Sequence, residues 1–446
     1  MRQFPYGKAA LCILFAAITA GLWLAAHPVK NKTATLTFWI FAKNHYDACK
    51  AAAASFEELH PGVKVDVQLV AGQAVTHRLQ AAFWSDLDVP DLVETEISAA
   101  GTFFRGPLEH VGFVDLTDRI HKEGLWDGMV QARFAPYTSR GRIFGLPNDI
   151  HPVMLAYRRD IFEQEGIDVS KIRTWDDFIR IGRKLTIPGK RYMIELSDSN
   201  QWSFEVCLFQ RGGGYFDSEG RCIIDNEIAV QTMCWYVPLV VGPNRIGNSL
   251  GTSQGSGQML TRALEDGYIL CLICPDWRTK QIEMDVPRVS GKMALMPLPA
   301  VTPGGPRTST FGGTMIGITK HCKNQDLAWE FAKHLYLDSR GLAQMFRMTN
   351  TVPALRKAWN QPAFAEPREY WSGQKIGLLY AALAPEVPAQ YTSPVIVTAK
   401  SKLGEALVEC IQRYKEHGDA GFEEFARASL RDSAEQVRAM IRRNPY

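Results

Sequence analysis

The sequence lacks a marked excess of charge of either sign. Its 446 residues include 50 Lys and Arg against 47 Asp and Glu, which gives a formal net charge of +3. No long basic stripe is visible, so nucleic-acid binding is not indicated. The charged fraction of 22% and the apolar fraction of 46% are those of globular proteins, and they exclude a wholly disordered chain.

Motifs for metal binding and catalysis are also scarce. The chain has no H-E-x-x-H motif and no paired-Cys zinc spacing, so no metal or other cofactor is expected. Residues 251–255 match the G-x-S-x-G nucleophile elbow, but that motif needs an apolar strand before it, and here a polar loop precedes it. The glycines at 212–214 lack the Lys-Ser/Thr of a phosphate loop. With no catalytic constellation, the sequence argues against an enzyme.

A long uncharged run occurs at the N-terminus. Residues 1–8 carry Arg2 and Lys8, and the next 18 residues, AALCILFAAITAGLWLAA, have no charge. This layout is typical of a secretory signal, although no clean A-x-A cleavage site ends it. The run is also long enough to remain as an anchor. We therefore predict export, with residues 1–26 as a signal peptide or an N-terminal anchor. Cys12 lies inside the run and is a poor lipid-attachment site.

The cysteines that follow the N-terminal segment are few and do not have the spacing of a disulfide framework. Eight of the nine follow the N-terminal segment. That even number permits disulfides outside the cytoplasm, but a chain of this length does not require them. Cys271 and Cys274 form a C-x-x-C motif, whose redox function needs the first Cys at a helix start. Residues 268–274, YILCLIC, are instead typical of a buried strand, which favours core packing.

Length and hydrophobic periodicity predict an α/β protein with more than one domain. The chain is too long for one compact core. Strand patterns at 34–41, 63–70 and 90–96 alternate with helix patterns at 45–62 and 74–85. Such alternation predicts a mainly parallel sheet covered by helices.

A second α/β region begins near residue 144. Thr174 and Asp177 have capping-box spacing at the start of a helical pattern over 174–186. Strands are expected at 268–277, 291–299 and 312–320, a glycine-rich hairpin within 212–226, and a polar loop over 242–258. From Asn324 the chain is predicted to be mostly helical.

Polar and aromatic residues gather where the predicted strands end. Ligands of open α/β sheets bind at the carboxyl ends of strands. An aromatic ring beside carboxylates and amides suits a sugar, because the ring covers the C–H face and the polar groups bond the hydroxyls. A single Trp is more often core and a single Glu more often solvated, so the argument is that several strand ends agree. The predicted ligand-binding residues are Trp39, Phe41, Asn44, His45, Glu96, Asn148, Asp149, Trp202, Asp276, Trp277, Arg278, Gly312 and Gly313.

The stretch FGLPNDIHPVMLAYRRDIF, residues 144–162, places Asn148, Asp149 and His151 between two apolar runs. From the residues alone, this segment is either a surface turn or the floor of a polar cleft.

The chain resembles the extracellular solute-binding proteins of ABC importers, in the sugar-binding branch and within it the arabinose-type binding proteins. The resemblance rests on eight stretches in order: LTFWIFAKNH, VPDLVETEISAAGTFFRG, VDLTDRI, GLPNDIHPVMLAYRRDIFEQEGID, TWDDFIRIGRKLT, ALEDGYILCLICPDW, GKMALMPLPAVTPGGPRTSTFGGTMIGITK and AWEFAKHLYLDSRGL. The loop at 242–258 and the missing lipid-attachment Cys depart from the family pattern.

This resemblance implies two α/β lobes of periplasmic-binding-protein architecture, joined by a hinge, with the ligand trapped in a cleft between them. The first lobe would comprise residues 33–146 plus 300–353, and the second 147–299 plus 354–446. Crossings would lie near 144, near 297–299 and near 350–353, with Asn148, Asp149 and His151 at the mouth of the cleft. Trp277 would form a platform under a sugar ring.

The function expected is that of a non-enzymatic, monomeric protein on the outer side of the cytoplasmic membrane. It would capture a mono- or oligosaccharide and deliver it to the permease subunits of an ABC transporter and their ATPase. Contact with the membrane would run only through the N-terminal segment or the permease. The alternatives are a binding protein for another solute, such as a polyamine or peptide, and an exported glycoside hydrolase, which needs two carboxylates flanking the bond.

Overall fold

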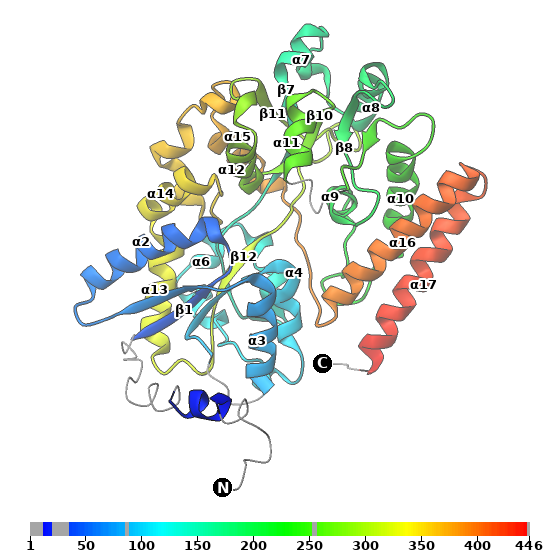
Figure 1. Ribbon diagram of the computed structural model, residues 1–446. Coiled ribbons are helices and arrows are strands. Elements are labelled where there is room, and N and C mark those ends of the chain that lie inside the picture. The colour runs from blue at the N-terminus through cyan, green and yellow to red at the C-terminus, as the bar shows by residue number, and fades with distance from the viewer. Residues whose placement is uncertain (1–11, 20–34, 85–88, 252–256, 444–446) are drawn as a thin grey trace.

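The structure is a computed structural model that describes residues 12–19, 35–84, 89–251 and 257–443 (Figure 1). Residues 12–19 are helical, while most of the N-terminal run and nearly all of the G-x-S-x-G match lie outside the described residues. In the part of the chain that is described, no helix has both the length and the apolar character needed to span a membrane.

Two five-stranded sheets form the centre of the molecule. The first has the order β2-β1-β3-β12-β6, and the second the order β11-β7-β10-β8-β9. The strands of the first sheet are β1 (Leu36–Ile40), β2 (Val65–Leu69), β3 (Leu92–Glu96), β6 (Leu146–Pro147) and β12 (Thr314–Ile318). Those of the second are β7 (Val153–Arg158), β8 (Tyr192–Glu195), β9 (Gly247–Asn248), β10 (Ile269–Pro275) and β11 (Met293–Pro297).

The prediction of a mainly parallel sheet is wrong, because both sheets are mixed. In the first sheet β1 is parallel to β2 and β3, whereas β12 is antiparallel to β3 and β6. In the second, β8 is parallel to β9 and β10, whereas β7 is antiparallel to β10 and β11. Parallel neighbours arise where a helix returns the chain to the same end of the sheet. β12 instead arrives from the second sheet and enters the first from the opposite end.

Helices cover both sheets, as the alternating pattern predicts. The helices of the first part of the chain are α2 (Lys43–Leu59), α3 (Gly72–Trp84), α4 (Ile97–Ala100), α5 (Thr117–Lys122) and α6 (Leu125–Gly128), with the short ladder β4 (Thr138–Ser139) and β5 (Arg142–Ile143) after them. Those around the second sheet include α7 (Arg159–Gln164), α8 (Trp175–Leu185), α9 (Trp202–Gln210), α10 (Glu227–Val240), α11 (Gln258–Glu265) and α12 (Asp276–Asp285).

The C-terminal third is helical, as predicted. It comprises α13 (Gln325–Leu337), α14 (Ser339–Thr349), α15 (Ile376–Leu383), α16 (Ile396–His417) and α17 (Phe422–Arg443). α13 and α14 pack on α2, beside the first sheet. α16 and α17 lie side by side along α10, at the right of Figure 1.

Several local predictions are confirmed. Thr174 and Asp177 form a capping box at the start of α8. All seven residues of β10 are buried, so Cys271 and Cys274 are core residues of a strand. Burial raises the pKa of the Cys274 thiol to about 12, which keeps it protonated and unsuited to redox exchange.

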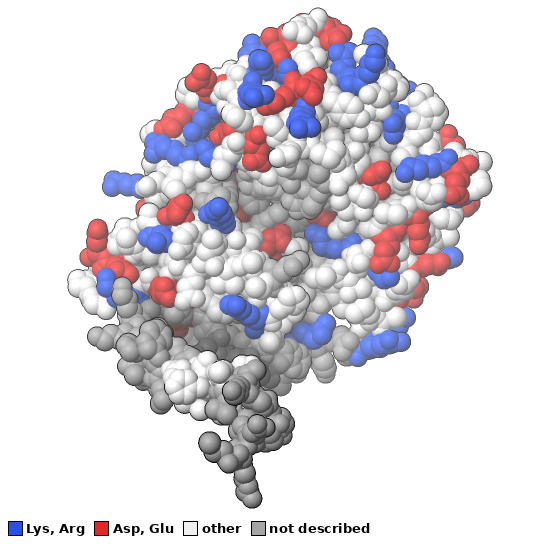
Figure 2. Space-filling model, in the orientation of Figure 1, with Lys and Arg blue, Asp and Glu red and all other residues white. Residues whose placement is uncertain are grey.

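Two local predictions need correction. The expected hairpin within 212–226 is reduced to one antiparallel bridge between Phe216 and Cys222, because the chain turns directly after Phe216, where the Asp217 carboxylate accepts from the backbone N–H groups of Glu219 and Arg221. The segment 242–258 is not wholly a loop, since β9 adds two residues to the edge of the second sheet beside β8. On the surface, basic and acidic side chains are interspersed over the face shown in Figure 2.

Candidate ligand-binding cleft

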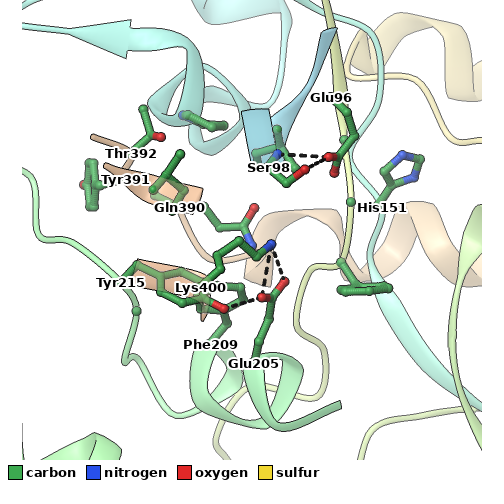
Figure 3. A pocket seen from close by; sticks show the side chains of 18 of the residues that line it. Glu96, Ser98, His151, Glu205, Phe209, Tyr215, Gln390, Tyr391, Thr392 and Lys400 are labelled. Carbon is green, nitrogen blue, oxygen red and sulfur yellow. Dashed lines mark hydrogen bonds and ion pairs between the residues drawn. The ribbon is translucent and has the colours of Figure 1, made fainter. Parts of the chain in front are cut away.

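A cavity of about 740 Å³ lies between the two sheets. One wall comes from the carboxyl ends of β1 and β3 and the start of β12, and another from the end of β10 and from α9. Residues 212–218 and a C-terminal segment, residues 387–395, complete it together with the first turns of α16 (Figure 3). Of the residues predicted from the sequence, those lining the cavity are Phe41, His45, Glu96, Trp277, Gly312 and Gly313.

Six of the other predicted residues do not line the cavity. Trp39 lies on β1, where its Nε1 donates to Gln68 Oε1 at 3.1 Å. Asn44 lies in α2, and its side chain falls outside the described part of the structure. The rest are buried behind the cavity wall, namely Asn148, Asp149, Trp202, Asp276 and Arg278. Ligand contact by the predicted set stays a prediction.

Aromatic rings form the wall next to the second sheet. Trp277 follows β10, is half-buried and donates from Nε1 to the carbonyl of Phe311 at 3.0 Å. Its ring centroid lies 6.0 Å from that of Phe311. Trp202 packs on Phe311 from behind, with the guanidinium of Arg278 5.2 Å above the Trp202 ring. Trp277 is therefore held in a fixed position with one side toward the cavity.

A buried charge network lies where the chain passes between the sheets. His151 Nε2 lies 3.1 Å from Asp149 Oδ2, and His151 Nδ1 lies 2.5 Å from Asp276 Oδ1. Arg133 donates from Nε to the backbone carbonyl of Asp149 at 2.9 Å and from Nη2 to the carbonyl of Gly312 at 3.0 Å. A Cβ at Gly313 would collide with the same guanidinium, so only glycine fits there.

The network shifts the pKa values of His151 and Asp149. Burial disfavours the charged imidazole, but Asp149 and Asp276 outweigh it and raise the pKa of His151 to about 9. Burial likewise disfavours ionised Asp149, yet the charges of His151 and Arg133 hold the pKa of that carboxyl well below its usual range. His151 is thus an imidazolium between two carboxylates near neutral pH.

This network ties together three segments that pass between the sheets. Asp149 follows β6, and its carboxylate accepts from Thr314 Oγ1 at 2.7 Å, at the start of β12. Asp276 accepts from the backbone N–H of Val352 at 2.6 Å. Asn148 and Asp149 are 2% and 0% exposed, which excludes the surface-turn interpretation of this stretch.

A second polar cluster faces the cavity from helices. Lys400 Nζ, on α16, lies 3.2 and 3.3 Å from the two carboxylate oxygens of Glu205, on α9. Tyr215 donates its hydroxyl to Glu205 at 2.5 Å. Burial lowers the pKa of Lys400, but Glu205 and Glu96 outweigh it and raise that pKa overall. Sequence reasoning missed this cluster because helix positions give no strand-end signal.

Glu96 stands at the end of β3 and caps α4. Its carboxylate accepts from the backbone N–H of Ser98 at 3.1 Å and from the Ser98 hydroxyl. Burial raises the pKa of Glu96, and Lys400 opposes that rise. Figure 3 shows Glu96 and Ser98 on one side of the cavity and Lys400 with Glu205 on another.

The C-terminal segment also escaped the sequence analysis. Its residues Gln390, Tyr391 and Thr392 line the cavity. The segment packs so closely on Gly101, just after α4, that a Cβ there would collide with Thr392 Oγ1 and the carbonyl of Ser393. A non-helical stretch more than 280 residues away in the chain therefore closes one side of the cavity.

Among the residues described, no group of three or more His, Cys, Asp and Glu side chains is arranged to hold a metal ion.

Comparison with known sequences decides the family. The profile of the bacterial extracellular solute-binding proteins matches residues 42–341. The chain belongs to this family. The family resemblance inferred from the sequence is therefore confirmed.

Relatives with a described ligand extend over most of the chain. An arabinooligosaccharide-binding protein of Halalkalibacterium halodurans is 24% identical over 338 residues, 75% of each chain. A protein of the same description from Bacillus subtilis is 25% identical over 366 residues, 81% of this chain and 82% of the relative. A lactose-binding protein of Rhizobium radiobacter is 26% identical over 362 residues, 79% and 83% of the two chains.

Solved structures share the fold. A crystal structure of a family 1 extracellular solute-binding protein superposes with a TM-score of 0.74 at 21% identity, over 90% of this chain and 99% of the other. A cyclo/maltodextrin-binding protein complexed with maltotetraose gives a TM-score of 0.70 at 16% identity, over 92% and 98%. The predicted two-lobed α/β architecture is confirmed.

Proposed function

We propose that this protein captures a carbohydrate in the cleft between its two lobes, on the outer side of the cytoplasmic membrane, and delivers it to an ABC transporter permease. The main support is the interlobe cavity of about 740 Å³, which combines aromatic rings with hydrogen-bonding side chains. That volume is in the upper part of the range of about 300–1,000 Å³ for small-molecule sites, which favours an oligosaccharide over a monosaccharide.

The two kinds of side chain match the two surfaces of a sugar. The rings of Trp277 and Phe209 supply flat apolar faces for C–H groups, and Glu96, Gln390 and Thr392 supply oxygens for hydroxyls. Relatives described as binding arabino-oligosaccharides and lactose support this ligand class.

The lobes we propose are residues 33–146 plus 300–353 and residues 147–299 plus 354–446. Sheet membership supports this division, since β1, β2, β3 and β12 belong to the first sheet and β7 to β11 to the second. Packing of α16 and α17 on α10 supports the place of the C-terminus in the second lobe. The proposed assembly is a monomer that meets the membrane through its N-terminal segment or through the permease.

A thermal-shift screen tests the ligand class. The purified protein is heated with neutral arabino-, galacto- and gluco-oligosaccharides, polyamines and short peptides. A ligand bound only by the native state raises the melting temperature, by an amount equivalent to about 2.7 kcal/mol at one hundred times its Kd. Stabilisation by a carbohydrate supports the proposal, whereas stabilisation by polyamines or peptides alone replaces it with another solute class.

A glycoside hydrolase is the second candidate, since Glu96 and Glu205 line the same cavity. The ion pair between Glu205 and Lys400 argues against a hydrolase. A hydrolase would need the Glu205 carboxylate as its nucleophile or general acid/base, and here that carboxylate is paired with the Lys400 ammonium. Incubation with arabino- and gluco-oligosaccharides separates the two functions. Release of shorter products at catalytic rates would show that the protein is an enzyme.

A further inference from the structure

The cavity presents side-chain oxygens whose hydrogen bonds the protein itself does not satisfy. Within the described part of the chain, Gln390 Oε1 and Thr392 Oγ1 are buried without a hydrogen-bond partner, and both residues line the cavity. The hydrogen bonds described for Glu96 come only from Ser98 and reach one of its two oxygens. Buried acceptors without a donor are costly, so a ligand that brings donors is favoured.

Neighbouring carboxylates cancel the positive charges of the histidines that line the cavity. His151 and Arg133 together face Asp149 and Asp276, two positive groups against two negative ones. His45 Nδ1 lies 3.2 Å from Glu94 Oε2, which is fully buried. These networks therefore add no positive charge that would attract an anionic ligand.

The remaining charged groups of the wall leave an excess of at least one negative charge. Asp217 pairs with Arg221, whose Nε lies 2.6 Å from Asp217 Oδ2 and whose Nη2 lies 2.9 Å from Glu219 Oε2. Lys400 then faces two carboxylates, Glu205 in direct contact and Glu96 through space. Because Glu205 takes both short contacts from Lys400, the uncompensated charge is that of Glu96.

We propose that the cleft selects its carbohydrate by charge, admitting sugars without an acidic group and rejecting sugars with a carboxylate or phosphate, and that Glu96 is the specificity-determining residue. The inference rests on the proposed function. An acidic group in the cavity would meet the Glu96 carboxylate in a partly desolvated space, where like charges repel more strongly than in water. Its oxygens, which only accept hydrogen bonds, would also leave Gln390 Oε1 without a donor.

The experiment uses a matched set of ligands made from one neutral oligosaccharide that stabilises the protein. One primary hydroxyl is oxidised to a carboxylate, and part of that product is converted to the uncharged amide, so acid and amide differ chiefly in charge. Calorimetric Kd values at pH 7 and low salt are compared. We expect the acid to bind at least tenfold more weakly than the amide.

The Glu96→Gln variant tests whether the charge of Glu96 causes the selectivity, since the amide keeps the shape of the side chain and its acceptor toward Ser98. We expect the acid-to-amide ratio of Kd to fall to threefold or less, whatever happens to the affinity for the neutral sugar. Glu58→Gln, an exposed change on α2, alters the total charge equally and should leave the ratio unchanged.

The outcomes separate the inference from the function on which it rests. An acid that binds within twofold of the amide, or a ratio that persists in Glu96→Gln, overturns selection by charge while carbohydrate binding stands. Stabilisation by acidic sugars only also overturns it. Failure of every carbohydrate to bind overturns the proposed function, and the inference with it.

Discussion

Two polar regions meet at the cleft, and they differ in how their hydrogen bonds are satisfied. In the network of Asp149, His151 and Asp276, each carboxylate is bonded to the imidazole and to a further protein donor. In the C-terminal segment, Gln390 and Thr392 hold buried oxygens without a partner in the described chain. The first region is complete without a ligand and the second is not.

This difference distinguishes polar groups that stabilise the fold from polar groups that are available to a ligand. A buried network whose members satisfy one another rigidifies the fold, because losing one member leaves the others unpaired. Unsatisfied acceptors around a cavity instead gain from a ligand that donates to them. Changes in the network should therefore affect stability, and changes in the segment should affect affinity.

The largest effect is expected for Asp149→Ala. Removing this carboxylate leaves His151 and Arg133 buried beside each other without their shared partner, which should cost about 3–5 kcal/mol in the free energy of unfolding. Chemical denaturation measures the loss. Asp127→Ala, at an exposed position of α6, is the control and should change stability by less than about 0.5 kcal/mol. Equal stability of the two variants would contradict the role of the network.

The next effect is a dependence of stability on pH. The pKa of His151 is raised from 6.5 to about 9 in the folded protein, so its contribution is fully present below pH 6.5 and is lost as the pH rises through about 9. The difference corresponds to about 3 kcal/mol at most. Free energies of unfolding between pH 6 and 10 should fall more steeply for the native protein than for His151→Gln. Parallel curves for the two proteins would show that His151 does not cause the pH dependence of stability.

Trp277 and Trp202 extend the contrast between ligand binding and stability to two aromatic residues of one cavity wall. Trp277→Ala removes a ring that faces the cavity and should weaken carbohydrate binding by about 1–3 kcal/mol. Trp202, 5% exposed behind Phe311, should instead cost about 3–5 kcal/mol of stability when replaced by Ala. Ligand affinity and melting temperature without ligand are measured for both variants. A large fall in melting temperature with normal affinity for Trp277→Ala would place that ring in the core.

The smallest effect is expected for Thr392→Val, which removes one hydroxyl and keeps the shape of the side chain. Affinity for the carbohydrate should fall by about 0.5–1.5 kcal/mol, the net value of one hydrogen bond, with an unchanged melting temperature. Thr76→Val, at a half-buried position of α3 where the hydroxyl donates to the backbone carbonyl of Gly72, serves as the control. A loss of stability without a loss of affinity would assign Thr392 to the framework.

Much of the fold follows from local patterns in the sequence. Strand and helix positions up to β3, the capping box of α8 and the helical C-terminus were predictable, because hydrophobic period and capping chemistry act over a few residues. The antiparallel β12 was not, because strand direction depends on where a distant connection enters the sheet.

Hydrophobic patterning alone places polar and aromatic residues at the ends of strands, and Phe41, Glu96 and Trp277 accordingly line the cavity. It did not reveal whether the partner of a polar residue is a ligand or another residue. Asp149 pairs with the imidazolium of His151 within the buried network, and Lys400 pairs with Glu205 across 195 residues of chain. These pairings depend on the tertiary structure, because hydrogen bonds and charge pairs form over a few ångströms between segments that packing brings together.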